Sequence, residues 1–246
     1  MIGLGLNDEK DITVKGLEAV KKCNYLFLEN YTSKLSIPLE KLEEFYEKKI
    51  FLANRELVEK RADEILNKAL EKNIGFLVIG DVFSATTHVD LYLRAKEKKL
   101  EIKVVHNTSI INAISIVGLE LYKYGRITSM PYFEDSFQPE SPYDVIKMNK
   151  DNVLHTLILL DIKENRNMTV NQALKQLLEI EEKRKEGVVK ETAKVIGCAR
   201  IGNDNQLIKY GAIKDLLKFD FGKPLHCLII PGKLHFMEEE MLKLYS

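Results

Sequence analysis

Short apolar runs recur along the first half of the chain, and each is followed by a stretch with helical periodicity. The run Phe76 to Ile79 is typical of a strand buried on both faces. Similar runs cover residues 1–6, 25–28, 50–53 and 102–105. Residues 13–22, 38–48, 56–71 and 89–98 carry apolar positions at helical spacing. This alternation predicts an α/β fold with a mainly parallel sheet and helices on its faces.

The second half of the chain predicts a core of its own. Its apolar runs cover residues 155–162, 194–201 and 225–230, and helical patterns cover 110–117, 170–183 and 236–244. Gly202 to Asn205 is typical of a hairpin turn, so this second sheet is expected to be mixed. We therefore expect two α/β domains, residues 1–108 and 109–246, with Thr169 capping the helix at 170–183.

A polar turn follows the buried strand at Phe76 to Ile79. It begins with Gly80-Asp81, and Ser84, Thr86 and Thr87 follow where the cap of the next helix is expected. Ligands of open α/β sheets bind at the carboxyl ends of strands, so this turn is a candidate binding site. A tight turn with ordinary caps is the alternative, and it stays open at this point.

A second polar turn, His106 to Asn112, follows the strand at 102–105. Ser109 is placed to cap the helix at 110–117, and its free N–H groups would lie at the same sheet edge as the Asp81 turn. Two such turns at one edge predict one ligand. We interpret His106 as a hydrogen-bonded structural residue rather than as a base or a metal ligand.

Charge and cysteine content exclude several classes of protein. The chain has 246 residues, with 37 Lys plus Arg and 37 Asp plus Glu. This zero net charge, without a basic block, argues against a nucleic-acid partner. Cys23, Cys198 and Cys227 form no CxxC pair, which argues against zinc and disulfides and favours buried thiols in a reducing compartment.

The apolar run at 154–160 is too short to span a bilayer. The first residues form no basic leader, so we expect a cytoplasmic protein without a membrane partner.

Two features suggest other functions. Gly3-Leu-Gly5 is part of the pattern used by nucleotide-binding oxidoreductases, but Asp8 stands where that pattern has its third glycine. The aromatic, proline-containing connection from Tyr122 to Pro142 is longer than most loops. It would also suit a non-catalytic protein-binding module.

Ordered blocks along almost the whole chain resemble the diphthine synthase family. The blocks are Ile2 to Leu6, Asp11 to Glu18, Glu29 to Ser33, Gly80 to His88, His106 to Ile110, Leu154 to Lys163, Ala199 to Gly202 and Pro224 to His235. The resemblance implies a tetrapyrrole-methylase-like fold, in which two α/β domains hold S-adenosylmethionine in a cleft between them, usually in a homodimer. It also implies a protein substrate, elongation factor 2, at a histidine that carries a 3-carboxy-3-aminopropyl group.

By the same resemblance, the cofactor contacts fall on strand ends, at Leu6, Asp81, Ser84, Ser109, Ile110, Leu160, Ile201 and His226. Asp81 is suited to accept hydrogen bonds from a hydroxyl or ammonium group of the cofactor. One departure is Val82, which stands where the family commonly has proline. No catalytic acid or base is assigned, because displacement at a sulfonium mainly needs alignment and a dry site.

The number of methyl groups distinguishes two branches of the family. Archaeal members trimethylate the amine, whereas eukaryotic members also esterify the carboxylate. Local choices around His106, Pro139 and Met237 resemble the eukaryotic branch, which favours four methyl groups. The short segment Lys163 to Met168 points the other way and keeps trimethylation as the alternative.

Overall fold

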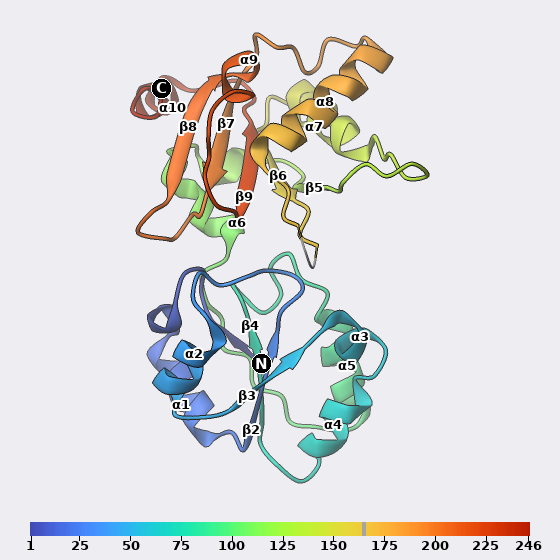
Figure 1. Cartoon of the computed structure of the whole chain (residues 1–246), viewed down its shortest axis with the longest axis vertical. Helices are drawn as coiled ribbons and strands as arrows, with labels where there is room; N and C mark the ends of the chain where they lie inside the picture. Colours follow the sequence, from blue (N-terminus) through green and yellow to red (C-terminus); the bar gives the residue numbers. More distant parts are fainter. Residues whose placement is uncertain (164–165) are drawn as a thin grey trace. The chain divides into compact units, whose positions relative to one another are not determined.

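The computed structural model describes residues 1–163 and 166–246, which form two compact α/β units (Figure 1). Unit 1 comprises residues 1–113 and unit 2 comprises residues 114–246. The division into 1–108 and 109–246 stays a prediction from the sequence. The predicted α/β class, with a parallel first sheet and a mixed second sheet, is confirmed.

The sheet of unit 1 is parallel. Its strands are β1 (Ile2–Gly3), β2 (Tyr25–Glu29), β3 (Ile50–Ala53) and β4 (Ile74–Val78), in the order β1-β4-β2-β3. The strand expected at 102–105 is reduced to one bridge between Val105 and Ile2. The other edge is β3, where Phe51 and Leu52 are each about half exposed.

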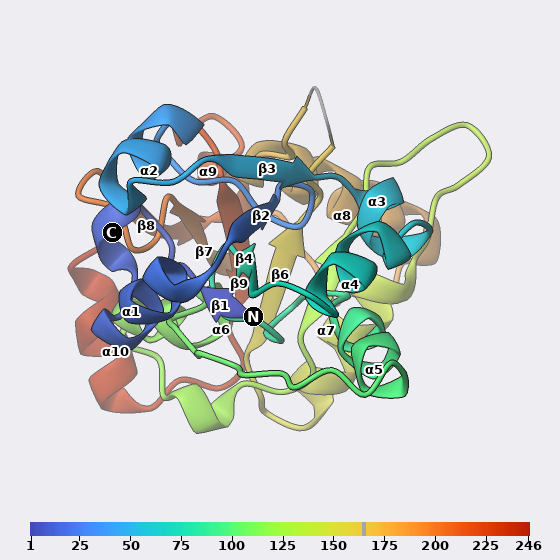
Figure 2. The ribbon, with the colours of Figure 1, turned by 90° about the horizontal axis from the view of Figure 1, so that it is seen from below.

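Helices cover both faces of this sheet. They are α1 (Val14–Lys22), α2 (Leu39–Tyr46), α3 (Arg55–Glu59), α4 (Asp63–Ala69) and α5 (Val89–Glu97). Unit 1 also contains a short 3-10 turn at Glu9–Asp11 and, at its end, α6 (Ile110–Ala113). Figure 2 shows α1 and α2 on one face and α3, α4 and α5 on the other, and a separate apolar cluster fills each side.

The prediction of a single helix at 56–71 is wrong, because the helical structure is interrupted between α3 and α4. The Glu56 carbonyl accepts from both the Lys60 and the Arg61 N–H groups, at 2.9 and 3.1 Å. The second of these bonds reaches one residue too far for a regular α-helix, so α3 ends there.

The sheet of unit 2 is mixed. Its strands are β5 (Thr128–Met130), β6 (Thr156–Leu160), β7 (Lys194–Ala199), β8 (Leu207–Ala212) and β9 (His226–Ile230), in the order β5-β6-β9-β7-β8. Only β5 and β6 pair in parallel among these described strands. The predicted turn at Gly202 to Asn205 joins the antiparallel strands β7 and β8, which confirms the hairpin.

The helices of unit 2 include two that the sequence patterns missed, one at Ser141–Asp151 and one at Ile213–Leu216. They are α7 (Ser141–Asp151), α8 (Val170–Arg184), α9 (Ile213–Leu216) and α10 (Phe236–Lys243), with 3-10 turns at Ile114–Val117 and Leu121–Lys123. Thr169 caps α8 in a capping box with Gln172, as expected. The connection from Tyr122 to Pro142 is not one irregular loop, because it contains β5 and the first two residues of α7.

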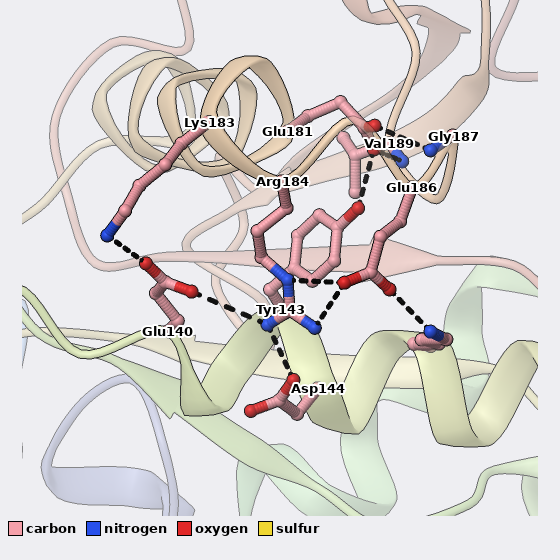
Figure 3. A network of polar contacts seen from close by, with 10 residues as sticks. Glu140, Tyr143, Asp144, Glu181, Lys183, Arg184, Glu186, Gly187 and Val189 are labelled. Carbon is pink, nitrogen blue, oxygen red and sulfur yellow. Dashed lines mark hydrogen bonds and ion pairs between the residues drawn. The ribbon is translucent and has the colours of Figure 1, made fainter.

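A network of charged groups fastens α8 to α7 (Figure 3). The Arg184 guanidinium lies 4.5 Å from the centre of the Tyr143 ring and forms ion pairs with Asp144, at 2.6 Å, and Glu186, at 2.8 Å. The Tyr143 hydroxyl donates to Glu181 at 2.7 Å. Because Tyr143 is fully buried, this hydroxyl would otherwise lack a partner.

A buried carboxylate fastens α10 within unit 2. Glu238 accepts four hydrogen bonds, from His155 Nε2 at 3.1 Å, Lys123 Nζ at 2.5 Å, and the N–H groups of Glu120 and His235 at 3.0 and 2.7 Å. Glu238 and His155 are both at most 1% exposed. Four donors offset the cost of burying this charge.

The three cysteines are free and buried, which confirms the prediction of buried thiols. Cys198 and Cys227 lie opposite each other in the β7–β9 register. Within residues 1–163 and 166–246, no group of three or more His, Cys, Asp and Glu side chains could hold a metal ion. The same residues contain no helix long and apolar enough to cross a bilayer.

Candidate functional site

Two glycines join the carboxyl ends of β1 and β4. Gly5 and Gly80 exchange backbone hydrogen bonds, with N–O distances of 3.2 and 2.7 Å. Both have a left-handed backbone, with φ of 82° and 83°, which an L side chain rarely adopts. A Cβ atom on Gly5 would also lie 2.5 Å from the Cβ atom of Asp11. The backbone therefore turns sharply away from the sheet after both β1 and β4, at the edge where ligands of such folds bind.

The Asp81 carboxylate is saturated with hydrogen bonds from unit 1. Its Oδ1 accepts from His106 Nδ1 at 2.8 Å and from the Asn107 N–H at 3.0 Å. Its Oδ2 accepts from the Phe83 N–H and from Ser84 Oγ, both at 3.2 Å. Burial alone would raise the pKa of Asp81, but these hydrogen bonds outweigh burial and lower it.

The hydroxyls after Asp81 do not cap α5, which contradicts the expectation from the sequence. Ser84 donates to Asp81, Thr86 donates to the Val82 carbonyl at 2.8 Å, and Thr87 lies 3.4 Å from Glu59. The cap position itself is His88, whose side chain makes no capping bond. These hydroxyls hold the loop in place instead of the helix end.

The second polar turn is tied to the first through His106 and Asn107. His106 is hydrogen-bonded, as predicted, but its side chain is 69% exposed and its partner is Asp81. The Asn107 side-chain amide donates to the carbonyls of Gly3 and Asp11, both at 3.0 Å. Asn107 therefore links the ends of three chain segments at one sheet edge.

The helix after this turn is shorter than predicted, and Ser109 does not cap it with its hydroxyl. Ser109 donates from its N–H and its Oγ to Asn112 Oδ1, at 2.8 and 3.2 Å. The α-helix ends at Ala113 and continues as a 3-10 turn to Val117. A side chain three residues inside the helix thus satisfies the helix start, as in one half of a capping box.

Unit 1 brings its predicted site residues together. A Cβ atom on Gly80 would lie 3.9 Å from side-chain atoms of both Leu6 and Ser109. Leu6 donates its N–H to Asp11 Oδ2 at 3.0 Å, and the Asn7 N–H donates to the same oxygen at 2.8 Å. Leu6 and Ile110 remain partly exposed. The edge therefore presents apolar side chains beside anchored polar groups.

Unit 2 gathers Leu160, Ile201 and His226 at one edge of its sheet. Leu160 ends β6, Ile201 follows β7, and His226 begins β9, which is antiparallel to both. His226 uses both ring nitrogens within unit 2, because Nδ1 accepts from the Val170 N–H at 3.3 Å and Nε2 donates to the Lys223 carbonyl at 3.1 Å. Burial is the main cause of its lowered pKa.

Backbone strain falls on these two edges. Six described non-glycine residues have positive φ, and four of them, Glu47, Lys99, Val153 and Lys185, follow the ends of helices, where that conformation is common. The other two are Ala85, with φ of 60°, and Arg200, with φ of 53°. Ala85 lies in the loop after Asp81, and Arg200 immediately precedes Ile201. Strain of this kind is typical of functional loops.

A separate hollow of about 380 Å³ lies in unit 1, near the amino ends of β1 and β4. Its lining includes Cys23, Phe76 and Leu91, with Lys22 and Lys72. The eight predicted site residues do not line it. The candidate site is therefore defined by the strand ends and not by this hollow.

Comparison with known proteins places the chain among methyltransferases. The family model for tetrapyrrole (corrin/porphyrin) methylases matches residues 1–217. A diphthine methyl ester synthase from Dictyostelium discoideum is 50% identical, covering 100% of this chain and 97% of that protein. A diphthine synthase from Methanocaldococcus jannaschii is 48% identical, covering 99% and 96%. A crystal structure of diphthine synthase has a TM-score of 0.92 at 34% identity, covering 100% and 94%.

Asp11, Asn107 and Asn112 are the anchoring residues that the sequence reasoning did not assign to the site. Asp11 and Asn107 belong to the family blocks, and Asn112 lies three residues after Ser109. That spacing is the one signal that could have identified Asn112, because a side chain at the third helical position often caps the helix start.

Proposed function

The chain belongs to the tetrapyrrole methylase family, and from this premise we propose that it transfers methyl groups from S-adenosylmethionine to the 3-carboxy-3-aminopropyl-histidine of elongation factor 2. The expectation of a methyltransferase of the diphthine synthase type is confirmed by the family model and by relatives that match the whole chain. The observation that carries the proposal is that whole-chain similarity, together with the anchored edge around Asp81.

The residues at this edge fit an S-adenosyl group. Partly exposed apolar side chains at Leu6 and Ile110 suit an adenine ring or a thioether, and the buried Ser109 lies, like Leu6, beside Gly80. We propose that these residues contact the cofactor together with Asp81 and Ser84, and with Leu160, Ile201 and His226 of unit 2.

The structure changes the role that we assign to Asp81. Both of its oxygens already accept two hydrogen bonds each, so it has little capacity left for a cofactor hydroxyl or ammonium. We propose that Asp81 acts mainly by fixing the loop from residue 81 to 88 and the turn at His106 and Asn107. The chemistry supplied by S-adenosylmethionine is a methyl group on a good leaving group, which leaves alignment to the protein.

A mass-spectrometric methyl count tests the function and separates its two versions. With S-adenosylmethionine and elongation factor 2 that carries the unmethylated precursor, we expect up to four methyl groups. One of them should be removed by mild alkali, because an ester hydrolyses and a quaternary ammonium does not do so by that route. Three methyl groups, none of them labile to alkali, would place the enzyme in the archaeal-type branch. No methylation of the precursor would contradict the proposed substrate.

The segment used to argue for the archaeal-type branch, Lys163 to Met168, includes residues 164 and 165, which lie outside the described residues. The argument for the archaeal-type branch therefore rests on the length of this segment in the sequence. Two of the most similar relatives carry different names: one is a diphthine methyl ester synthase, at 50% identity, and the other is a diphthine synthase, at 48% identity. The experiment above is needed to decide between them.

Titration calorimetry separates this function from the alternatives. We expect binding of S-adenosylmethionine and S-adenosylhomocysteine and no binding of NAD. Tight binding of NAD alone would favour the nucleotide-binding oxidoreductase. Binding of none of the three would favour the protein-binding module.

We further propose that the enzyme works in the cytoplasm as a homodimer. Light scattering coupled to size exclusion should give about twice the mass of the 28.3 kDa chain. A single-chain mass at micromolar concentration would contradict the dimer without affecting the methyltransferase assignment.

A further inference from the structure

The exposed imidazole of His106 is held in one orientation beside the candidate cofactor edge. Its Nδ1 lies 2.8 Å from Asp81 Oδ1, and this carboxylate is itself fixed by two backbone N–H groups and by Ser84. A carboxylate can only accept, so in the neutral ring Nδ1 carries the proton and donates it. The other nitrogen, Nε2, is then an unprotonated acceptor on a side chain that is 69% exposed.

The proposed reaction needs a proton acceptor for some of its steps and not for others. The substrate amine is mainly an ammonium at neutral pH, and it must lose a proton before its lone pair can attack. The nitrogen then forms a bond to the methyl carbon while the carbon–sulfur bond breaks, and that electron pair stays on sulfur. The product is again an ammonium, so three N-methylations require three proton removals. A carboxylate attacks without losing a proton.

We propose that His106 Nε2 accepts the proton from the substrate ammonium before each N-methylation, with Asp81 orienting the ring. This inference rests on the proposed function. The imidazolium formed would carry its charge next to the Asp81 carboxylate, which stabilises it, and would release the proton to solvent through its exposed face. Asp81 is the charged group bonded to His106, and Asp11 is the other carboxylate anchored at the same edge.

The variant His106→Asn tests the proposal, because an asparagine amide can still donate to Asp81 but cannot take up a proton. Thr108→Ala is the matched control, since Thr108 is exposed in the same turn. The substrate amine lies beside a free carboxylate, so its pKa is above the value of about 8 of a peptide N-terminus, and the amine is almost wholly protonated at pH 7. N-methylation by His106→Asn should therefore be about 10-fold slower or more at pH 7, and the deficit should shrink at pH 9, while ester formation and binding of S-adenosylhomocysteine stay unchanged.

Equal rates for His106→Asn and the unsubstituted enzyme at both pH values would overturn the proposal. So would an equal loss at both pH values together with weaker binding of S-adenosylhomocysteine, since that result means a structural role. The ¹⁵N NMR signals of the ring give a readout that needs no turnover, and they should report the Nδ1–H tautomer. An Nε2–H tautomer would overturn the proposal even if the unsubstituted enzyme modifies a different substrate, whereas absence of methylation by the unsubstituted enzyme refutes the proposed function alone.

Discussion

Each unit contains a carboxylate that accepts four hydrogen bonds, one of them from a histidine. In unit 1, Asp81 binds His106 at 2.8 Å, and in unit 2, Glu238 binds His155 at 3.1 Å. The pairs differ in the second nitrogen of the ring. His155 is fully buried, and its Nδ1 accepts from the Gly232 N–H at 3.0 Å, whereas His106 is largely exposed.

This difference in the second ring nitrogen distinguishes a histidine that holds the fold together from one that can exchange protons. Burial is the main cause of the lowered pKa of His155, and both of its nitrogens are committed to holding α10 and the start of the Gly232 turn in place. The ring of His106 is held by one hydrogen bond, from Nδ1 to Asp81, and its side chain is 69% exposed. A carboxylate–histidine pair therefore has a structural role in unit 2 and, by our proposal, a chemical role in unit 1.

The largest expected effect comes from breaking the buried pair. Glu238→Ala removes the acceptor of four donors, and it leaves His155 Nε2 without an acceptor inside the fold, so the free energy of unfolding should fall by about 3 to 5 kcal/mol. Urea denaturation of the whole chain measures this, with the exposed neighbour Glu239→Ala as the control. Equal loss in both variants would mean that the buried pair has no special weight.

Acid should weaken the same pair in a defined pH range. Burial alone would raise the pKa of Glu238, but hydrogen bonds from His235, Lys123, Glu120 and His155 outweigh it and lower the pKa to about 2. A carboxylate with a lowered pKa stabilises the fold above its ordinary pKa of 4.5 and loses that contribution as the pH falls toward 2. The contribution is about 3 kcal/mol. In Glu238→Gln, the urea midpoint should fall less steeply than in the unsubstituted chain between pH 4.5 and 2.

The exposed pair should affect binding more than stability. We expect Asp81→Ala to weaken binding of S-adenosylhomocysteine by about 1 to 3 kcal/mol, because the loop around Phe83 and the Asn107 turn lose their common acceptor. Calorimetry measures the affinity, and far-UV circular dichroism checks that the fold persists. An unfolded variant would support the alternative that Asp81 is only a structural turn residue.

The smallest effect is expected at His226, a histidine that shares features with both His155 and His106. His226 is buried and fully hydrogen-bonded, like His155, yet it begins β9 at the candidate edge of unit 2. We expect His226→Ala to lower the affinity for S-adenosylhomocysteine by about 1 kcal/mol or less, through the loss of support for that edge. Unchanged affinity in calorimetry would assign His226 to the core alone.

Periodicity predicted the architecture because the buried strands are continuous apolar runs and the helices have an apolar face. Periodicity failed to predict local structure where one residue pattern is compatible with more than one conformation. Ser84 and Thr86 carry the hydroxyls of helix caps but bond to Asp81 and to the Val82 carbonyl instead. Pro142 was interpreted as part of a loop, although proline is well tolerated in the first turn of a helix, where it lies in α7.

The candidate site was predictable in its strand ends but not in its bonding. The sequence predicted that the Asp81 and His106 turns share one sheet edge, but it did not show that these two side chains, 25 residues apart, form a hydrogen bond. Nor could the sequence show that both oxygens of Asp81 are already occupied. Contacts of this kind depend on how the ends of β4 and the Val105 bridge are placed side by side by the whole sheet.

The exposed edge of the unit 1 sheet has a consequence for handling the protein. The strand β3 has an unpaired side, and Phe51 and Leu52 expose half of their surface there. Such an edge can template cross-β association between chains. Lys49 before the strand and Arg55 just after it form ion pairs with Glu43 and Glu59, so this edge carries little unbalanced charge that could repel a second copy. Because the whole chain also has zero net charge at pH 7, concentrated solutions should keep best at a pH away from 7, where copies repel each other.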